Sequence, residues 1–327
     1  METTAADGVV AARPRADEGL SAWSDALLVG AALAYAAFIG VLTLARGQLP
    51  SADVLLVAAG FGAAMGLRGR VAVLRDWMPF LVLFLAYELM RGLADDVGLP
   101  VHAADIVALE RGLFGGALPT AVLQGWLHPA TGVDPLAVVG TLVYLLHFPL
   151  PLATAILLWR RRPELFHPYL VALILLSFAG FATYLLLPVA PPWMAVELGV
   201  LGAAPADGGV AYLKPDAFAW LAQSIGIDGA RLYDVVFRSI NANPVAAFPS
   251  LHAAYPFLTF LVLRRAFGRI GWLALGYFAL VAFTIVYTAD HYVVDVLAGA
   301  AYASGAYGLM WWLARRRGAA VRGGLRS

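Results

Sequence analysis

The sequence of 327 residues contains no cysteine, which excludes disulfide bonds and thiolate metal sites. Charged residues are also scarce: they make up 13% of the chain, whereas 61% of it is hydrophobic. Together with a mean hydropathy of +0.79, this composition indicates an integral membrane protein. The formal net charge of +1 gives no reason to expect a nucleic-acid partner.

Eight apolar runs approach the length of about 20 residues that a membrane-spanning helix needs. They predict an all-α membrane protein with a disordered cytoplasmic tail at 1–24, a polytopic membrane domain at 25–314 and a basic cytoplasmic tail at 315–327. The second and sixth runs are short, which leaves six, seven or eight spans open. The predicted spans are residues 25–45, 51–67, 73–90, 134–159, 167–188, 250–264, 269–289 and 292–314.

Basic residues gather in alternate loops between these spans. One side of the membrane receives 16 of the 22 Lys and Arg residues. Because cytoplasmic loops carry an excess of Lys and Arg, we predict that both termini are cytoplasmic and that residues 91–133 and 189–249 are extracytoplasmic. His252 then begins a span that starts outside, and His291 ends a span that finishes outside. The two histidines are therefore predicted to share one membrane face.

Titratable groups beside apolar spans are costly and usually functional. His291 and Asp295 are four residues apart, which in a helix places both side chains on one face. The carboxylate would fix the tautomer of His291 and aim its other nitrogen for nucleophilic attack. His252 follows Pro249 and Ser250, where Ser250 is suited to cap the helix, and His252 is placed to protonate a leaving oxygen. The backbone amides at this helix start favour an anion such as phosphate.

Other interpretations of these residues stay open. A histidine within a membrane often forms a hydrogen bond between helices and has no catalytic role. A transporter whose buried histidines relay protons is a non-enzymatic alternative, although no predicted span carries a charge at its centre. Two histidines with one or two carboxylates make a sparse metal site, so we predict no metal and no cofactor. His128, His147 and His167 are interpreted as structural.

The two histidine motifs together resemble those of a known enzyme family. Pro249-Ser250-Leu251-His252 and His291-Tyr292-Val293-Val294-Asp295 are similar to the second and third motifs of the type 2 phosphatidic acid phosphatase (PAP2) superfamily. Its lipid phosphatases usually have Gly in place of Leu251 and Arg in place of Ile285, and their first motif, Lys-x6-Arg-Pro, is absent here. These departures favour the inositolphosphotransferase branch, which contains inositol phosphorylceramide synthases and their bacterial relatives. Weaker similarities are Pro191-Pro192-Trp193, Tyr87-Glu88-Leu89-Met90-Arg91 and Leu113-Phe114-Gly115.

The resemblance implies a six-helix core over about residues 75–310, preceded by about two additional helices. It also implies an active site near the extracytoplasmic surface and a phosphohistidine intermediate. In that scheme His291 is the nucleophile, Asp295 orients it, and His252 protonates the departing alcohol.

Transferring a phosphoryl group requires positive charge on its non-bridging oxygens. We predict that Arg91 supplies this charge, because it ends a span on the correct side within one of the weaker motifs. Ser250 and Lys214 are the further candidate phosphate-binding residues, and Arg231 and Arg238 are substitutes for Arg91.

We therefore predict a bacterial plasma-membrane enzyme that transfers a phosphate-bearing head group from a phospholipid or polyprenyl-phosphate donor to an alcohol acceptor. The alternative is a lipid phosphate or polyprenyl diphosphate phosphatase of the same superfamily, in which water is the acceptor. Both reactions share the first half-reaction. Residues 104–127 are predicted to form an interfacial helix near the lipid entrance, and residues 189–249 a lid over the site.

Overall fold

The computed structural model describes residues 76–77, 99–205, 208–229 and 244–324. Within these ranges the chain is mainly helical and contains no β-strand, apart from two isolated bridges that join Val189 to His102 and Ala246. The predicted all-α fold is thereby confirmed. The predicted N-terminal tail, the spans at 25–45 and 51–67 and nearly all of 73–90 lie outside the described residues.

Several described helices are suited to cross a membrane. Pro163–Leu186, Leu251–Tyr287 and Val293–Leu313 are long and apolar enough by length and composition, although Leu251–Tyr287 consists of two helices, described below. A further span results if α6 (Pro135–Leu145) and α7 (Leu150–Arg161) are taken as one broken span. The protein is therefore a multi-pass membrane protein, whereas the six-helix core stays a prediction.

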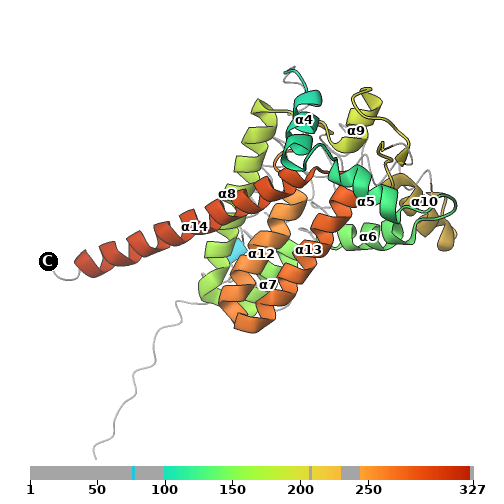
Figure 1. Ribbon diagram of the computed structural model, residues 1–327. Helices are drawn as coiled ribbons and strands as arrows, with labels where there is room; N and C mark the ends of the chain where they lie inside the picture. The colour runs from blue at the N-terminus through green and yellow to red at the C-terminus, as the bar shows by residue number, and fades with distance from the viewer. Residues whose placement is uncertain (1–75, 78–98, 206–207, 230–243, 325–327) are drawn as a thin grey trace, which may run out of the picture.

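The segment from Leu251 to Tyr287 folds back on itself. Helix α12 (Leu251–Phe267) ends at Gly268, whose φ of 62° suits glycine, and the short 3-10 helix η3 (Gly268–Gly271) leads into α13 (Trp272–Tyr287). Helices α12 and α13 then pack side by side (Figure 1). The start of α12 and the end of α13 consequently lie at the same end of the hairpin.

The predicted span 134–159 is not one continuous helix. Asp134 caps α6 by accepting a hydrogen bond from Ala137 N at 3.0 Å, but the helix stops at Leu145 and α7 begins at Leu150 with a bend of 44°. Proline explains the break, because Pro149 and Pro151 have no N–H to donate to the preceding turn.

Helices α7, α8 (Pro163–Leu186), α12 and α14 (Val293–Gly324) enclose the main apolar core. Leu158, Leu176 and Leu258 are completely buried there. Figure 1 shows α14 running past the other described helices toward the C-terminus. The helix continues to Gly324, so most of the predicted basic tail is helical.

Shorter helices gather at the end of this bundle where α12 begins and α13 ends (Figure 1). They are α4 (Ala104–Leu113), α5 (Pro119–Leu127), α9 (Pro192–Glu197) and α10 (Lys214–Ser224). The single interfacial helix predicted for 104–127 is thus two helices, separated at Gly115 and Gly116, whose φ angles of 64° and 91° end a right-handed helix.

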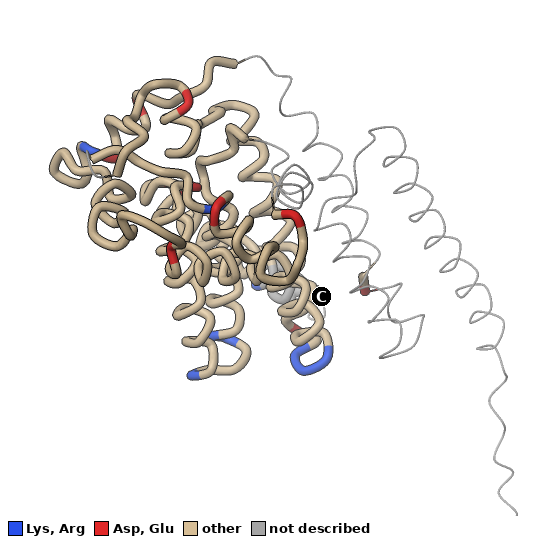
Figure 2. The backbone as a smooth tube through the Cα atoms, turned by 90° about the vertical axis from the view of Figure 1, so that its right-hand side faces the viewer, with Lys and Arg blue, Asp and Glu red and all other residues tan. Residues whose placement is uncertain are grey.

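Arginines occupy the opposite end of the bundle. They lie in the α7–α8 turn and at the α12–α13 turn, and Figure 2 shows both turns as basic tips of the tube. The start of α12, which carries His252, and the end of α13, which the loop with His291 follows, lie away from these tips. The basic residues concerned are Arg160, Arg161, Arg162, Arg264, Arg265 and Arg269.

Gly299 marks a close approach of α14 to the start of α12. A Cβ atom at this position would lie 2.3 Å from the carbonyl oxygen of Ser250, a backbone atom that cannot rotate away. We expect Gly299→Ala to cost about 1–3 kcal/mol of stability and to lower turnover, because His252 lies two residues after Ser250 in the first turn of α12. Gly305→Ala on the same helix meets nothing within 4 Å and is the matched control. Equal thermal midpoints for the two variants would contradict this packing.

Candidate active site

The structure brings His252 and His291 into direct contact. Ser250 caps α12 by accepting a hydrogen bond from Ala253 N at 3.3 Å, which places His252 in the first turn of that helix. His291 lies in the short loop between α13 and α14. The Nδ1 atom of His252 is 2.8 Å from the Nε2 atom of His291. Two residues that the sequence assigned to one site therefore face each other.

The backbone carbonyl of Ala247 sets the tautomer of His291. A carbonyl oxygen only accepts hydrogen bonds, so His291 Nδ1, 3.0 Å from Ala247 O, carries the hydrogen and donates it. In the neutral ring the lone pair is then on Nε2. This lone pair faces His252, which makes Nε2 the nitrogen that is placed for nucleophilic attack.

Asp295 lies on the Nδ1 side of His291. Its Oδ2 atom is 3.4 Å from His291 Nδ1 and accepts a hydrogen bond from Tyr292 N at 2.8 Å. The prediction that one helix carries both residues is wrong, because α14 begins at Val293 and His291 precedes it. The two side chains still meet because Asp295 bonds back to the start of its own helix, as the third residue of a capping box does.

Tyr144 and His147 extend the site. The hydroxyl oxygen of Tyr144 is 3.0 Å from His252 Nε2, and the ring centroids of His147 and His252 are 4.7 Å apart. His147 was interpreted as structural within a continuous span, but the break after α6 places it beside the histidine pair. Its Nδ1 atom donates to Tyr144 O at 2.6 Å. The sequence analysis missed both residues, although a tyrosine three residues before a histidine in an apolar run was an available signal.

Lys214, the single lysine of the sequence, is buried against Asp290 and Tyr144. Its Nζ atom is 2.7 Å from Asp290 Oδ1 and 3.3 Å from the centre of the Tyr144 ring. Burial lowers the pKa of Lys214, and the carboxylate of Asp290 opposes this shift. Asp290 directly precedes His291 in the chain, and Tyr144 contacts His252, so one intervening residue links the ammonium group to each histidine.

Of the other predicted phosphate-binding residues, only Ser250 lies within the described part of the chain. Arg91, Arg231 and Arg238 lie outside the described residues. Ser250 is buried at the start of α12, where its Oγ accepts the capping bond and its hydroxyl hydrogen remains a donor. Among the predicted cations, Lys214 is thus the one that lies within the described residues, against Asp290 and Tyr144.

Glu110 of α4 covers the start of α14. Its two carboxylate oxygens accept hydrogen bonds from Val293 N at 2.8 Å and from Val294 N at 3.1 Å. The side chain is completely buried, and burial raises the pKa of Glu110 while the two N–H groups act in the opposite direction. No sequence pattern indicates this contact, because Glu110 and Val293 are 183 residues apart.

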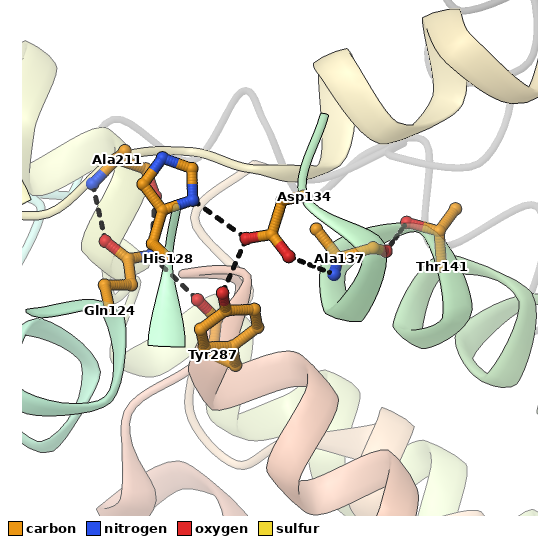
Figure 3. A network of polar contacts seen from close by, with 7 residues as sticks. All are labelled: Gln124, His128, Asp134, Ala137, Thr141, Ala211 and Tyr287. Atoms are coloured by element: carbon orange, nitrogen blue, oxygen red, sulfur yellow. Dashed lines mark hydrogen bonds and ion pairs between the residues drawn. The ribbon is translucent and has the colours of Figure 1, made fainter. Parts of the chain in front are cut away.

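His128 belongs to a second polar network, shown in Figure 3. Its Nδ1 atom is 2.8 Å from Asp134 Oδ2, which also accepts a hydrogen bond from Tyr287 OH at 2.5 Å. Gln124 donates to Tyr287 O and to Ala211 O and accepts from Ala211 N. The network ties α5, α6 and α13 together, which is in keeping with a structural role for His128.

A comparison with known families identifies the fold. Residues 104–309, more than half of the chain, match the model of the PAP2 superfamily. The chain belongs to the PAP2 superfamily. The matched range begins at α4 and ends in α14, so it contains both histidines, Asp295 and Lys214. The protein is accordingly an enzyme of the PAP2 type, a lipid phosphotransferase or phosphatase.

One relative narrows the branch of the PAP2 superfamily. The chain is 28% identical to the phosphoinositol dihydroceramide synthase of Bacteroides thetaiotaomicron over 245 residues, which cover 72% of this chain and 74% of the relative. No solved structure matches the chain significantly. The predicted resemblance to the inositolphosphotransferase-like branch is confirmed.

Proposed function

We propose that this PAP2 enzyme transfers a phosphate-bearing head group between lipids through a phosphohistidine intermediate on His291. The contact between His291 Nε2 and His252 Nδ1, at 2.8 Å, carries the proposal. Two-step phosphoryl transfer needs a nucleophile and a proton donor and acceptor that both reach the same phosphate group. The Ala247 carbonyl gives His291 the required tautomer, and His252 is the neighbouring group that can exchange a proton.

In the first half-reaction, His291 Nε2 attacks the phosphorus of the donor and the P–O bond to the lipid alcohol breaks. Protonated His252 gives its Nδ1 proton to the departing oxygen, so the alcohol leaves neutral. The donor phosphate has to enter between the two imidazole nitrogens. The His252 ring therefore turns away from His291 when the donor binds.

In the second half-reaction, neutral His252 takes the proton of the acceptor hydroxyl, whose oxygen attacks the phosphorus. The P–N bond breaks and its electron pair returns to His291 Nε2. Throughout both steps, we propose that Lys214 and the Ser250 hydroxyl stabilise negative charge on the non-bridging oxygens, since Lys214 is held by Asp290, the residue before His291, and Ser250 lies two residues before His252. Water in place of the alcohol would give hydrolysis by the same route.

The relative suggests which groups are exchanged. By its name it is a synthase of phosphoinositol dihydroceramide. We propose phosphoinositol as the transferred group, a phospholipid as its donor and a lipid alcohol of the ceramide class as its acceptor.

The distribution of charge supports an extracytoplasmic site. The histidines lie near the end of the α12–α13 hairpin that is opposite the α12–α13 turn. Figure 2 shows the arginines of that turn and of the α7–α8 turn at basic tips of the tube. Since arginine-rich turns face the cytoplasm, the histidine pair would face the other side.

Product analysis tests this function. The purified protein is incubated in vesicles with phosphatidylinositol, with and without dihydroceramide, and with a polyprenyl diphosphate in a parallel arm. We expect phosphoinositol dihydroceramide and diacylglycerol by mass spectrometry only when both lipids are present, and no product with His291→Ala. Release of inorganic phosphate from polyprenyl diphosphate without head-group transfer would show a phosphatase instead.

We also expect activity to survive exhaustive chelation. Within the described part of the chain, no group of three or more His, Asp or Glu side chains is arranged to hold a metal ion. The proposed charge stabilisation comes from Lys214 and hydroxyl donors, so dialysis against EDTA should change turnover by less than about twofold. Loss of turnover that one divalent ion restores would contradict the proposed chemistry.

A further inference from the structure

We propose that Glu110 is a positioning residue for the nucleophile, acting through the first turn of α14. This inference rests on the proposed function in one respect, namely that His291 is the nucleophile. Glu110 itself touches neither histidine in the hydrogen bonds described above; its contacts are with the backbone that follows His291.

Two carboxylates accept hydrogen bonds from the backbone amides at the start of α14. The first N–H groups of a helix have no partner inside the helix, and the partial positive charge there favours an anion. Asp295 takes Tyr292 N, while Glu110 takes Val293 N and Val294 N, one with each oxygen. Both acids therefore hold the same turn, and Asp295 also lies 3.4 Å from His291 Nδ1.

This arrangement differs from the ordinary helix caps in the same chain. Asp134 and Ser250 cap α6 and α12 from the adjacent position in the sequence. At the start of α14 the capping group comes instead from α4, 183 residues away, and it is a completely buried carboxylate. A buried carboxylate is an expensive way to stabilise a helix end, since a local serine or threonine can accept from one amide of the first turn without burying a charge.

The contact with Glu110 fixes the orientation of the first turn of α14 relative to α4, which a local cap cannot do. A cap within the sequence satisfies the amides wherever the helix happens to lie, whereas Glu110 also fixes the direction of the first turn relative to α4. Glu110 accepts from Val293 N and Val294 N, and Ser250 N donates to the backbone carbonyl oxygen of Asp295 at 3.0 Å. The loop carrying His291 enters this clamped turn, so the clamp determines how far Asp295 lies from the imidazole.

Glu110→Gln tests the inference with little change in size. The amide keeps one acceptor oxygen but presents an NH₂ group to the second backbone N–H, so one of the two bonds is lost. We expect kcat to fall on the order of 10²-fold, because a shift of about 1 Å at the reacting atoms has that effect. KM for the donor should stay within about threefold, since Glu110 does not bind the substrate. Glu110→Asp keeps the charge and should recover part of the lost kcat.

Asp134→Asn is the matched control. It also removes a carboxylate that caps a helix start, on α6, but its partners are His128, Tyr287 and Ala137 (Figure 3). We expect it to lower the thermal midpoint while kcat per folded molecule stays within about threefold of the parent enzyme.

A readout without turnover separates this inference from the proposed function. Vanadate mimics pentacoordinate phosphorus and bonds to a positioned nucleophile, whereas inorganic phosphate needs only a cationic site. We expect Glu110→Gln to weaken vanadate affinity about tenfold or more and phosphate affinity by less than about threefold, measured as shifts of the thermal midpoint with ligand concentration.

The outcomes are distinguishable. If the enzyme hydrolyses lipids and transfers nothing, the proposed function fails, yet the kcat and vanadate losses still test Glu110. The inference is overturned if Glu110→Gln keeps kcat and vanadate affinity near those of the parent enzyme. It is also overturned if Asp134→Asn shows the same selective losses, or if the parent enzyme does not bind vanadate.

Discussion

Replacing His291 by alanine is expected to lower turnover on the order of 10⁴-fold or more while the protein stays folded. The reason is that no phosphohistidine can form without the Nε2 lone pair that faces His252. Replacing His252 by alanine removes the proton carrier and should cost about 10²- to 10⁴-fold. Product formation at saturating donor, with folding checked by thermal melting, measures both effects. A variant that retains turnover close to the parent enzyme would remove its residue from the proposed mechanism.

The leaving group separates the two roles. A phosphodiester donor with a nitrophenol leaving group needs little protonation when its P–O bond breaks. His252→Ala should therefore recover much of the first half-reaction with this donor, whereas His291→Ala should recover nothing. Equal recovery in both variants, or recovery in His291→Ala alone, would mean that the nucleophile and the acid have been assigned wrongly.

Lys214→Met is expected to lower turnover about 10²- to 10³-fold, the range found when one donor to a developing oxyanion is removed. Lys214 contacts Asp290, which precedes His291, and the ring of Tyr144, which contacts His252. The same change leaves the Asp290 carboxylate without its cation, which costs about 3–5 kcal/mol of stability when a buried pair is broken. Turnover has to be measured per folded molecule for that reason.

The double variant Lys214→Met with Asp290→Asn distinguishes charge stabilisation from architecture. Removing both charges together avoids the unpaired carboxylate, so most of the lost stability should return. If Lys214 stabilises the transferring phosphate, turnover stays low in the double variant although its thermal midpoint recovers. Turnover that recovers together with the thermal midpoint would make the ion pair structural and transfer the phosphate role to Arg91, Arg231 or Arg238.

The histidine pair was within reach of sequence reasoning because its evidence is local. Each histidine lies at the edge of an apolar run, and the alternation of arginine-rich loops places both at the same end of consecutive spans. The structure agrees on this juxtaposition. The spacing argument was wrong about His291 and Asp295, because His291 precedes α14 and does not belong to it. A spacing of four residues does not show whether both residues lie inside a helix or one of them lies just before its start.

The rest of the site depends on contacts that no local pattern encodes. His147 enters the site because Pro149 and Pro151 break a run whose hydropathy is uninterrupted. Lys214 and Glu110 come from helices outside the predicted spans, and their partners, Asp290 and the start of α14, are distant in sequence. The sequence does not show whether a charged residue in a polar segment is buried or exposed to solvent, because its burial results from tertiary packing.

Trapping the covalent intermediate tests the central claim most directly. The parent enzyme is mixed with a phospholipid donor in the absence of acceptor, quenched within milliseconds to seconds, digested at alkaline pH and analysed by mass spectrometry. We predict an acid-labile adduct, a phosphoryl group bearing the donor's head group, on the peptide that contains His291. It should disappear on addition of the acceptor alcohol and be absent from His291→Ala. An adduct on His252, or steady turnover in His291→Ala, would contradict the proposal.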